Sequence, residues 1–153
     1  MAIKKKQTIV IGDSNIWISL LINPTKNAFL IDALNNSSLR FLICKQLLEE
    51  IQNVALREKF RKWFDESLIQ DLITVLKSKC HNLEIIEKEH PDLRDPKDNF
   101  IITLAEQGKA DIIVTGDKDI LDIENKLGKT KVIQLAQFKQ FLENLKITQN
   151  RPC

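Results

Sequence analysis

The chain has 153 residues, 43% hydrophobic and 29% charged, which is enough for one folded domain with a buried core and excludes a disordered chain. Lys and Arg number 23 against 21 acids, so any affinity for nucleic acid depends on where the charges lie. No apolar run approaches the roughly 20 residues of a membrane span, and the basic start lacks a signal-peptide core. The three cysteines, Cys44, Cys80 and Cys153, lack metal-ligand spacing, so we expect free thiols. Free thiols and the lack of a membrane or secretion signal together predict a cytoplasmic location.

Short β-branched runs alternate with segments of helical period along the chain. The runs predict strands at Thr8–Ile11, Leu39–Ile43, Leu83–Ile86, Asp111–Val114 and Lys131–Ile133. The segments predict helices at Asn15–Ile22, Asn27–Leu34, one long stretch Gln46–Lys79, Lys97–Gln107 and Leu135–Leu145. This order is typical of an α/β fold, a three-layer α/β/α sandwich with a central parallel sheet of four to five strands. We expect one domain over residues 1–146 and a C-terminal tail at 147–153.

Acidic residues follow two of the predicted strands. Asp13 comes directly after the first strand, and Asp117 follows the fourth in Thr115-Gly-Asp-Lys-Asp119. The carboxyl ends of parallel strands meet at one rim, where ligands of such sheets bind, so both side chains are expected there. Taken singly, each acid is better explained as a turn former or helix N-cap than as a functional residue.

A third acid is selected by its angle on a helix. Leu47, Leu48, Ile51, Val54 and Ala55 form one apolar stripe at about 100° per residue. Glu50 lies roughly 100° from the centre of this stripe and Glu49 roughly 160°, which predicts that Glu49 faces solvent and Glu50 borders the core.

The segment Asp95-Pro96-Lys97-Asp98 has the features of a helix start. Asp95 suits the N-cap, Pro96 the first turn, and Asp98 the positive end of the helix dipole. The same position would hold the Asp98 carboxylate near the strand rim, so capping and metal binding both remain open. Carboxylates that gather at one place repel one another unless a cation is bound, and an all-oxygen site suits Mg²⁺ or Mn²⁺.

These segments together resemble the motifs of PIN domains. The resemblance rests on Asp13-Ser-Asn15, Leu47-Leu-Glu-Glu-Ile51, Asp95-Pro-Lys-Asp-Asn99 and Thr115-Gly-Asp-Lys-Asp119, and covers roughly residues 8–121. It differs at Gly12, where a larger apolar residue is common, and at Ser14, where Thr is usual. The long helical insert before His81, together with the Thr115-Gly-Asp-Lys-Asp119 segment, makes the chain most similar to PIN domains that are toxins of toxin–antitoxin pairs.

The resemblance implies a metal-dependent endoribonuclease that uses Mg²⁺ or Mn²⁺, dimerises, and is held inactive by a small antitoxin protein. It implies that Asp13 and Asp98 bind the metal and that Asp117 binds it directly or through a water. It implies that Glu50 orients a metal-bound water or holds a second ion. It also implies supporting roles for the hydrogen-bonding residues Ser14, Asn15 and Thr115. Asp119 is a possible fifth acid or a cap of the following turn.

Aromatic and basic residues outside these motifs have plainer interpretations. Trp17 is expected in the core, and Phe60, Trp63 and Phe64 at helical spacing predict core or a protein-binding groove more than a base-stacking platform. The basic clusters favour solvated surface over phosphate contact (Lys4, Lys5, Lys6, and Arg57, Lys59, Arg61, Lys62).

Two other functions compete with that of a nuclease. One is a PIN-like module that binds a protein or RNA partner without turnover, since every acid has a credible structural role. The other is phosphoryl transfer through an aspartyl nucleophile, which is disfavoured because Asn15 stands where that chemistry wants a second Asp and no Gly-rich phosphate loop is present.

Overall fold

The structure is a computed structural model of the chain, and it describes residues 6–92 and 99–149. Its centre is a five-stranded sheet in the order β3-β2-β1-β4-β5 with every pair parallel, which confirms the predicted parallel sheet. The strands are β1 (Thr8–Gly12), β2 (Leu39–Ile43), β3 (His81–Asn82), β4 (Ile112–Val114) and β5 (Lys131–Ile133).

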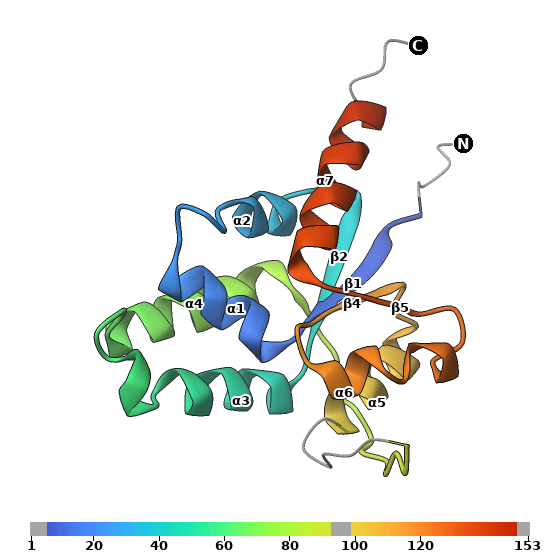
Figure 1. Cartoon of the computed structure of the whole chain (residues 1–153), viewed down its shortest axis with the longest axis horizontal. Coiled ribbons are helices and arrows are strands. Elements are labelled where there is room, and N and C mark those ends of the chain that lie inside the picture. The colour runs from blue at the N-terminus through green and yellow to red at the C-terminus, as the bar shows by residue number, and fades with distance from the viewer. Residues whose placement is uncertain (1–5, 93–98, 150–153) are drawn as a thin grey trace.

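Helices cover both faces of the sheet and complete the predicted α/β/α layers (Figure 1). They are α1 (Ser14–Ile22), α2 (Phe29–Leu34), α3 (Lys45–Ala55), α4 (Glu66–Lys79), α5 (Asn99–Gly108), α6 (Lys118–Leu121) and α7 (Leu135–Gln149), with 3₁₀ turns η1 (Glu58–Phe60) and η3 (Glu124–Lys126). The last helix therefore extends into the segment predicted as a tail, and the start of the predicted helix Lys97–Gln107 lies outside the described residues.

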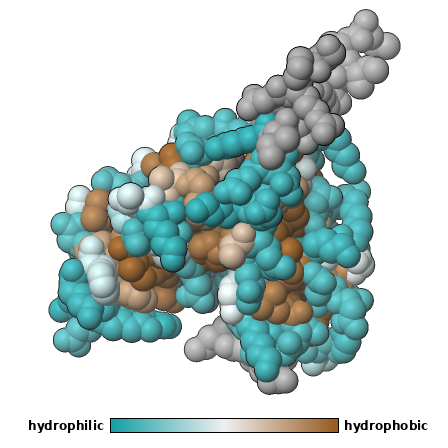
Figure 2. All heavy atoms as spheres, turned by 45° about the horizontal axis from the view of Figure 1, so that its top comes forward, coloured by the Kyte–Doolittle hydropathy of each residue, from teal (hydrophilic) through white to brown (hydrophobic). Residues whose placement is uncertain are grey.

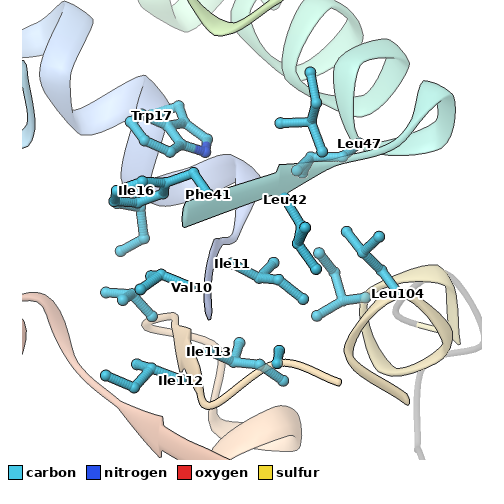
Figure 3. Close-up of a cluster of buried hydrophobic side chains, with 14 of the residues drawn as sticks. Val10, Ile11, Ile16, Trp17, Phe41, Leu42, Leu47, Leu104, Ile112 and Ile113 are labelled. Carbon is cyan, nitrogen blue, oxygen red and sulfur yellow. The ribbon is translucent and has the colours of Figure 1, made fainter. Parts of the chain in front are cut away.

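Successive residues of the strands point to opposite faces of the sheet and pack against different helices. On one face, the Phe41 ring makes edge contacts with Trp17 of α1 at 5.7 Å and with Phe138 of α7 at 6.2 Å. On the other face, Leu42 points toward Leu104 of α5 (Figure 3). This alternation is what a parallel sheet buried on both faces requires. Trp17 is 1% exposed, which confirms its predicted place in the core.

The predicted strand at Leu83–Ile86 is wrong. The pairing with β2 lies two residues earlier, at His81–Asn82, because β2 ends at Ile43 and the chain enters α3 at Lys45. Only Leu83 N still donates to Ile43 O, at 2.8 Å. Further on, the Gln107 side chain accepts from Ile86 N at 2.9 Å and donates to Ile86 O at 2.7 Å, and so replaces a neighbouring strand.

The long helical stretch predicted over Gln46–Lys79 is broken into α3 and α4. Arg57 is extended, with φ −59° and ψ 141°, and α4 starts afresh where the Asp65 side chain accepts from Leu68 N at 3.0 Å. The break turns Phe64 inward against a second core cluster of Ile18, Ala55 and Ile69. Packing of this aromatic ring outweighs the helical periodicity of the segment.

Within the described residues, no helix is long and apolar enough to cross a membrane. Cys44 is buried and Cys80 is half-buried, and both are free thiols. Burial raises the pKa of the Cys80 thiol to about 12, so it stays protonated and unreactive at neutral pH.

Gly108 marks a close approach between α5 and β2. A Cβ at this position would lie 2.2 Å from Cδ1 of Leu42, a buried side chain. Gly108→Ala should therefore reduce the free energy of unfolding by about 1–3 kcal/mol through overpacking. Gly116→Ala is the matched control, because nothing lies within 4 Å of its Cβ position. Urea denaturation of both variants tests this, and equal midpoints would contradict the close packing.

Candidate functional site

Asp13 stands at the carboxyl end of β1, beside the end of β4. Its backbone N donates to Val114 O at 2.9 Å, continuing the β1–β4 ladder by one bond. The residue then leaves the strand with φ −64° and ψ 160° and serves as the N-cap of α1. Its side chain is buried, with only 4% exposure. Strand pairing and helix start thus place one carboxylate inside the rim of the sheet.

The Thr115 hydroxyl joins the two strand-end acids. Thr115 Oγ1 donates to Asp13 Oδ2 at 2.8 Å and accepts from the backbone N of Asp117 at 3.0 Å. The other oxygen, Asp13 Oδ1, accepts from Ser14 N at 2.8 Å. A carboxylate has about four acceptor positions, and Thr115 and Ser14 occupy at most three of them, so the Asp13 carboxylate keeps capacity for a further ligand.

Asp117 lies at the same rim, half-buried after β4. It is the N-cap of α6, and its Oδ1 accepts from Asp119 N at 2.9 Å. Asp119 is half-buried in the first turn of α6, where a negative charge is favoured. The structure therefore gives Asp117 both of the properties weighed in the sequence, a place at the rim and a cap.

Burial raises the pKa of the Asp13 carboxyl above its ordinary value of 3.8, and the nearby charge of Asp117 raises it further. The hydrogen bonds from Thr115 and Ser14 act in the opposite direction. Because the pKa is raised overall, the ionised form of Asp13 reduces the stability of the folded chain. A cation bound beside the carboxylate would offset this destabilisation.

Glu50 and Glu49 of α3 differ in exposure as their helical angles predict. Glu49 is exposed and lies 3.8 Å from Lys45 Nζ. Glu50 is half-buried, and its Oε2 atom is out of contact with solvent. Glu50 is therefore the acid that leans over the edge of the core.

The remaining predicted site residues have different surroundings. Ser14 is buried at 3% exposure and its side chain also hydrogen-bonds Asp13. Asn15 is exposed on the first turn of α1. Asp98 lies outside the described residues. Within residues 6–92 and 99–149, no three His, Cys, Asp or Glu side chains are close enough to hold a metal.

Asn99 is a residue to which the sequence analysis assigned no role. It starts α5 next to Asp98 in the chain, and its Oδ1 atom is buried and accepts no hydrogen bond from a described residue. A buried amide oxygen without a donor is uncommon, and such oxygens are ligands of hard cations. The signal was present in the sequence as an amide directly after a candidate acid.

Comparison with known protein families shows the family to which the chain belongs. The family model described as PIN domain matches residues 9–119, which include both strand-end acids and α3. The chain belongs to the PIN domain family. PIN domains are in general nucleases that use divalent metal ions.

Solved structures share the fold of this PIN domain at low sequence identity. PAE2754 from Pyrobaculum aerophilum is 16% identical with a TM-score of 0.62, and the match covers 90% of each chain. VapBC2 from Rickettsia felis, solved bound to a DNA fragment from its promoter, is 17% identical with a TM-score of 0.53. That match covers 83% of this chain and 98% of the other. A search of curated proteins finds no match.

The donor set of this PIN domain fits an oxygen-ligated divalent cation. Asp13 is a buried carboxylate with acceptor capacity, Asp117 raises its pKa from close by, and the Asn99 oxygen lacks a described donor. Mg²⁺ and Mn²⁺ favour carboxylate and carbonyl oxygens. The PIN domain thus offers the right ligand chemistry.

The raised pKa of Asp13 predicts a pH-dependent stability. The folded chain binds this proton more tightly than the unfolded chain, whose pKa is about 3.8, so the free energy of unfolding falls as pH rises above 3.8 through the folded pKa. Asp13→Asn removes the effect. Without metal, the variant should melt a few degrees above wild type at neutral pH, with the gap closing as pH falls toward 3.8.

Thermal melts in EDTA from neutral pH downward test this expectation. The control is Asp71→Asn, at an exposed position in the middle of α4, and it should leave the melting temperature unchanged at every pH. A wild type more stable than Asp13→Asn throughout the range would contradict the cost assigned to the buried carboxylate.

Proposed function

We propose that this PIN domain is a metal-dependent endoribonuclease that hydrolyses RNA phosphodiester bonds, and that it is the toxin of a type II toxin–antitoxin pair. The observation that carries the proposal is the Thr115 hydroxyl, which ties the buried Asp13 carboxylate to the backbone of Asp117. A capping role for Asp13 needs only one of its oxygens, whereas the second is also held in place, inside the rim.

In this function, three acids would hold Mg²⁺ or Mn²⁺, namely Asp13, Asp98 and Asp117. When bound, the metal supplies stabilisation of the phosphate charge and activation of a water molecule. Ser14 and Thr115 fix the orientation of the Asp13 oxygens. Asn15 and Asp119 are proposed to support the ligands from the adjoining first turns of α1 and α6.

Glu50 would act on the attacking water. Its partly enclosed carboxylate can accept a hydrogen bond from that water and orient it for attack on phosphorus. The water proton would pass to the Glu50 carboxylate as the new P–O bond forms and the bond to the leaving ribose oxygen breaks, and that oxygen would take up a proton from solvent. The enclosed position limits the ways in which this side chain can move.

An apolar groove supports a partner protein such as a small antitoxin. Hydrophobic side chains reach the surface on the side of the molecule that carries α1, α2 and α4 (Figure 2). Ile31 is 39% exposed and Leu68 46%, and contiguous apolar surface of this kind commonly binds another protein. We propose an antitoxin as the occupant, in a homodimeric, cytoplasmic protein.

A binding module without turnover is the second candidate function. It is favoured by the observation that Asp13 and Asp117 each cap a helix, so both have a structural use without metal. Titration with Mn²⁺ separates the two functions. Saturable binding that Asp98→Asn abolishes supports the nuclease, whereas no binding, with Asp98→Asn as stable as wild type, supports the module.

Glu50→Gln and Glu49→Gln form a matched pair that tests catalysis. Glu50→Gln should lower the rate of RNA cleavage about 100-fold or more with either metal, as expected when a group that acts on the attacking water is lost. Glu49→Gln should cleave at the wild-type rate, because Glu49 is exposed. Cleavage of a labelled single-stranded RNA with Mg²⁺ or Mn²⁺ provides the measurement.

Asp13→Asn serves as the variant expected to be inactive in the same assay. Two outcomes would overturn the nuclease proposal. One is cleavage by Asp13→Asn equal to that of wild type, and the other is no cleavage by wild type with any metal and RNA tried. Equal loss in Glu50→Gln and Glu49→Gln would overturn the role given to Glu50 alone.

A further inference from the structure

The loop between α3 and α4, residues 56–65, combines an exposed tryptophan with a cluster of basic side chains. Trp63 is 53% exposed, although its spacing from Phe60 and Phe64 predicted a place in core or groove. All of the basic residues of this α3–α4 loop are exposed (Arg57, Lys59, Arg61 and Lys62). Figure 1 shows the loop at the end of α3 that is distant from β5.

The exposure of Trp63 follows from how its neighbours are anchored. Phe64 is 5% exposed in the second core cluster, and Phe60 stacks on it with centroids 5.7 Å apart and planes 20° apart. Because Phe60 and Phe64 anchor the loop to the core, the Trp63 side chain between them faces solvent. A firmly placed aromatic ring in water is costly to keep unless something covers it.

The charges around Trp63 favour a polyanion. Between Arg57 and Trp63 the loop has four basic residues and one acid, Glu58, a net charge of +3. Lys62 Nζ lies 5.2 Å from the Trp63 ring centroid. None of the four basic side chains forms an ion pair with an acid in the described part of the chain. The nearby Asp65 caps α4.

We propose that the α3–α4 loop binds single-stranded RNA, with a base stacked on Trp63 and phosphates contacting the flanking basic side chains. The inference rests on the proposed function and adds a substrate-binding surface to it. From Glu50 to Ala55 the helix carries the chain roughly 8 Å away from the acidic rim. A strand held at the loop can therefore run along α3 toward the acids.

Single-stranded RNA fits this surface better than a duplex or a protein. Stacked bases of a duplex do not reach a side chain on the protein surface, whereas unpaired bases stack on aromatic rings. Protein interfaces are depleted of lysine at their centres, yet Lys59 and Lys62 lie directly over the aromatic rings of the loop. Basic side chains interleaved with aromatic rings are typical of single-strand binding surfaces.

Intrinsic fluorescence can report on this loop, because Trp17 is 1% exposed and Trp63 is the exposed one of the two tryptophans. The Asp13→Asn chain in EDTA, which keeps the RNA intact, would be titrated with a short single-stranded oligonucleotide. We expect saturable quenching of the exposed tryptophan emission and little effect of a duplex of the same length. Quenching that depends on protein concentration without RNA would instead indicate a second copy of the chain and overturn the proposal.

Binding of fluorescein-labelled RNA, measured by anisotropy, tests the residues. Trp63→Ala should weaken binding about 10-fold, as expected for one lost stacking contact. Ile86→Ala, at a 78% exposed apolar side chain, should not change it. Arg61→Gln with Lys62→Gln should weaken binding and lower the salt slope by about 1.4, two contacts at about 0.7 each, whereas Lys77→Gln with Lys79→Gln on α4 should not.

Each outcome separates this inference from the nuclease proposal. Wild-type affinity in Trp63→Ala, or equal losses in the loop pair and the α4 pair, would overturn the RNA surface even if the protein cleaves RNA. Specific binding through Trp63 without cleavage by wild type would leave the surface standing and overturn the nuclease.

Discussion

The parallel pairing of β1 with β4 is the constraint on which the site depends. These strands lie far apart in the chain, and their alignment brings Asp13 next to the Thr115 hydroxyl, 102 residues further along. The hydrogen bond between them crosses from one strand end to the other inside the protein, where the carboxylate is removed from water. Any slip of this register would move the Thr115 hydroxyl away from the carboxylate and leave a buried charge without its donor. The architecture and the acidic rim are therefore held by the same pairing.

Much of the fold could be predicted from hydrophobic periodicity, and the failures share one cause. The strands at Leu39–Ile43 and Lys131–Ile133 lie where their apolar residues predict, because both are short runs preceded by polar turns. The errors at Leu83–Ile86 and within Gln46–Lys79 come from contacts distant in the chain. The early end of β2 withdraws the partner of one segment, and the burial of Phe64 bends the other. The hydrophobic periodicity of a single segment does not depend on such long-range contacts and cannot predict them.

The individual acids of the candidate site could be predicted from the sequence, whereas the hydrogen bonds between its residues could not. Topology alone places Asp13 and Asp117 at one rim, and helical angle distinguishes Glu50 from Glu49 by exposure. The Thr115 hydroxyl bridges Asp13 and Asp117 only because the fold brings both residues next to it. The sequence alone therefore indicates no more than a supporting role for Thr115. Asn99 has only its place after Asp98 to mark it in the sequence, because the burial of its oxygen depends on the tertiary structure. The metal-binding set itself includes Asp98 and stays a prediction.

Trp17 and Gly12 form a pair whose importance extends beyond packing. The indole Nε1 donates to Gly12 O at 2.9 Å, and the ring lies 2.9 Å from where a Cβ of residue 12 would stand. The missing side chain at position 12 thus has a counterpart in the large ring at position 17. A larger residue at position 12 would clash with the Trp17 ring, and a smaller residue at position 17 would leave a cavity beside Gly12. The peptide that leads into Asp13 therefore depends on a large side chain at position 17 and on the absence of one at position 12, so a repair of either substitution would need a compensating change at the other.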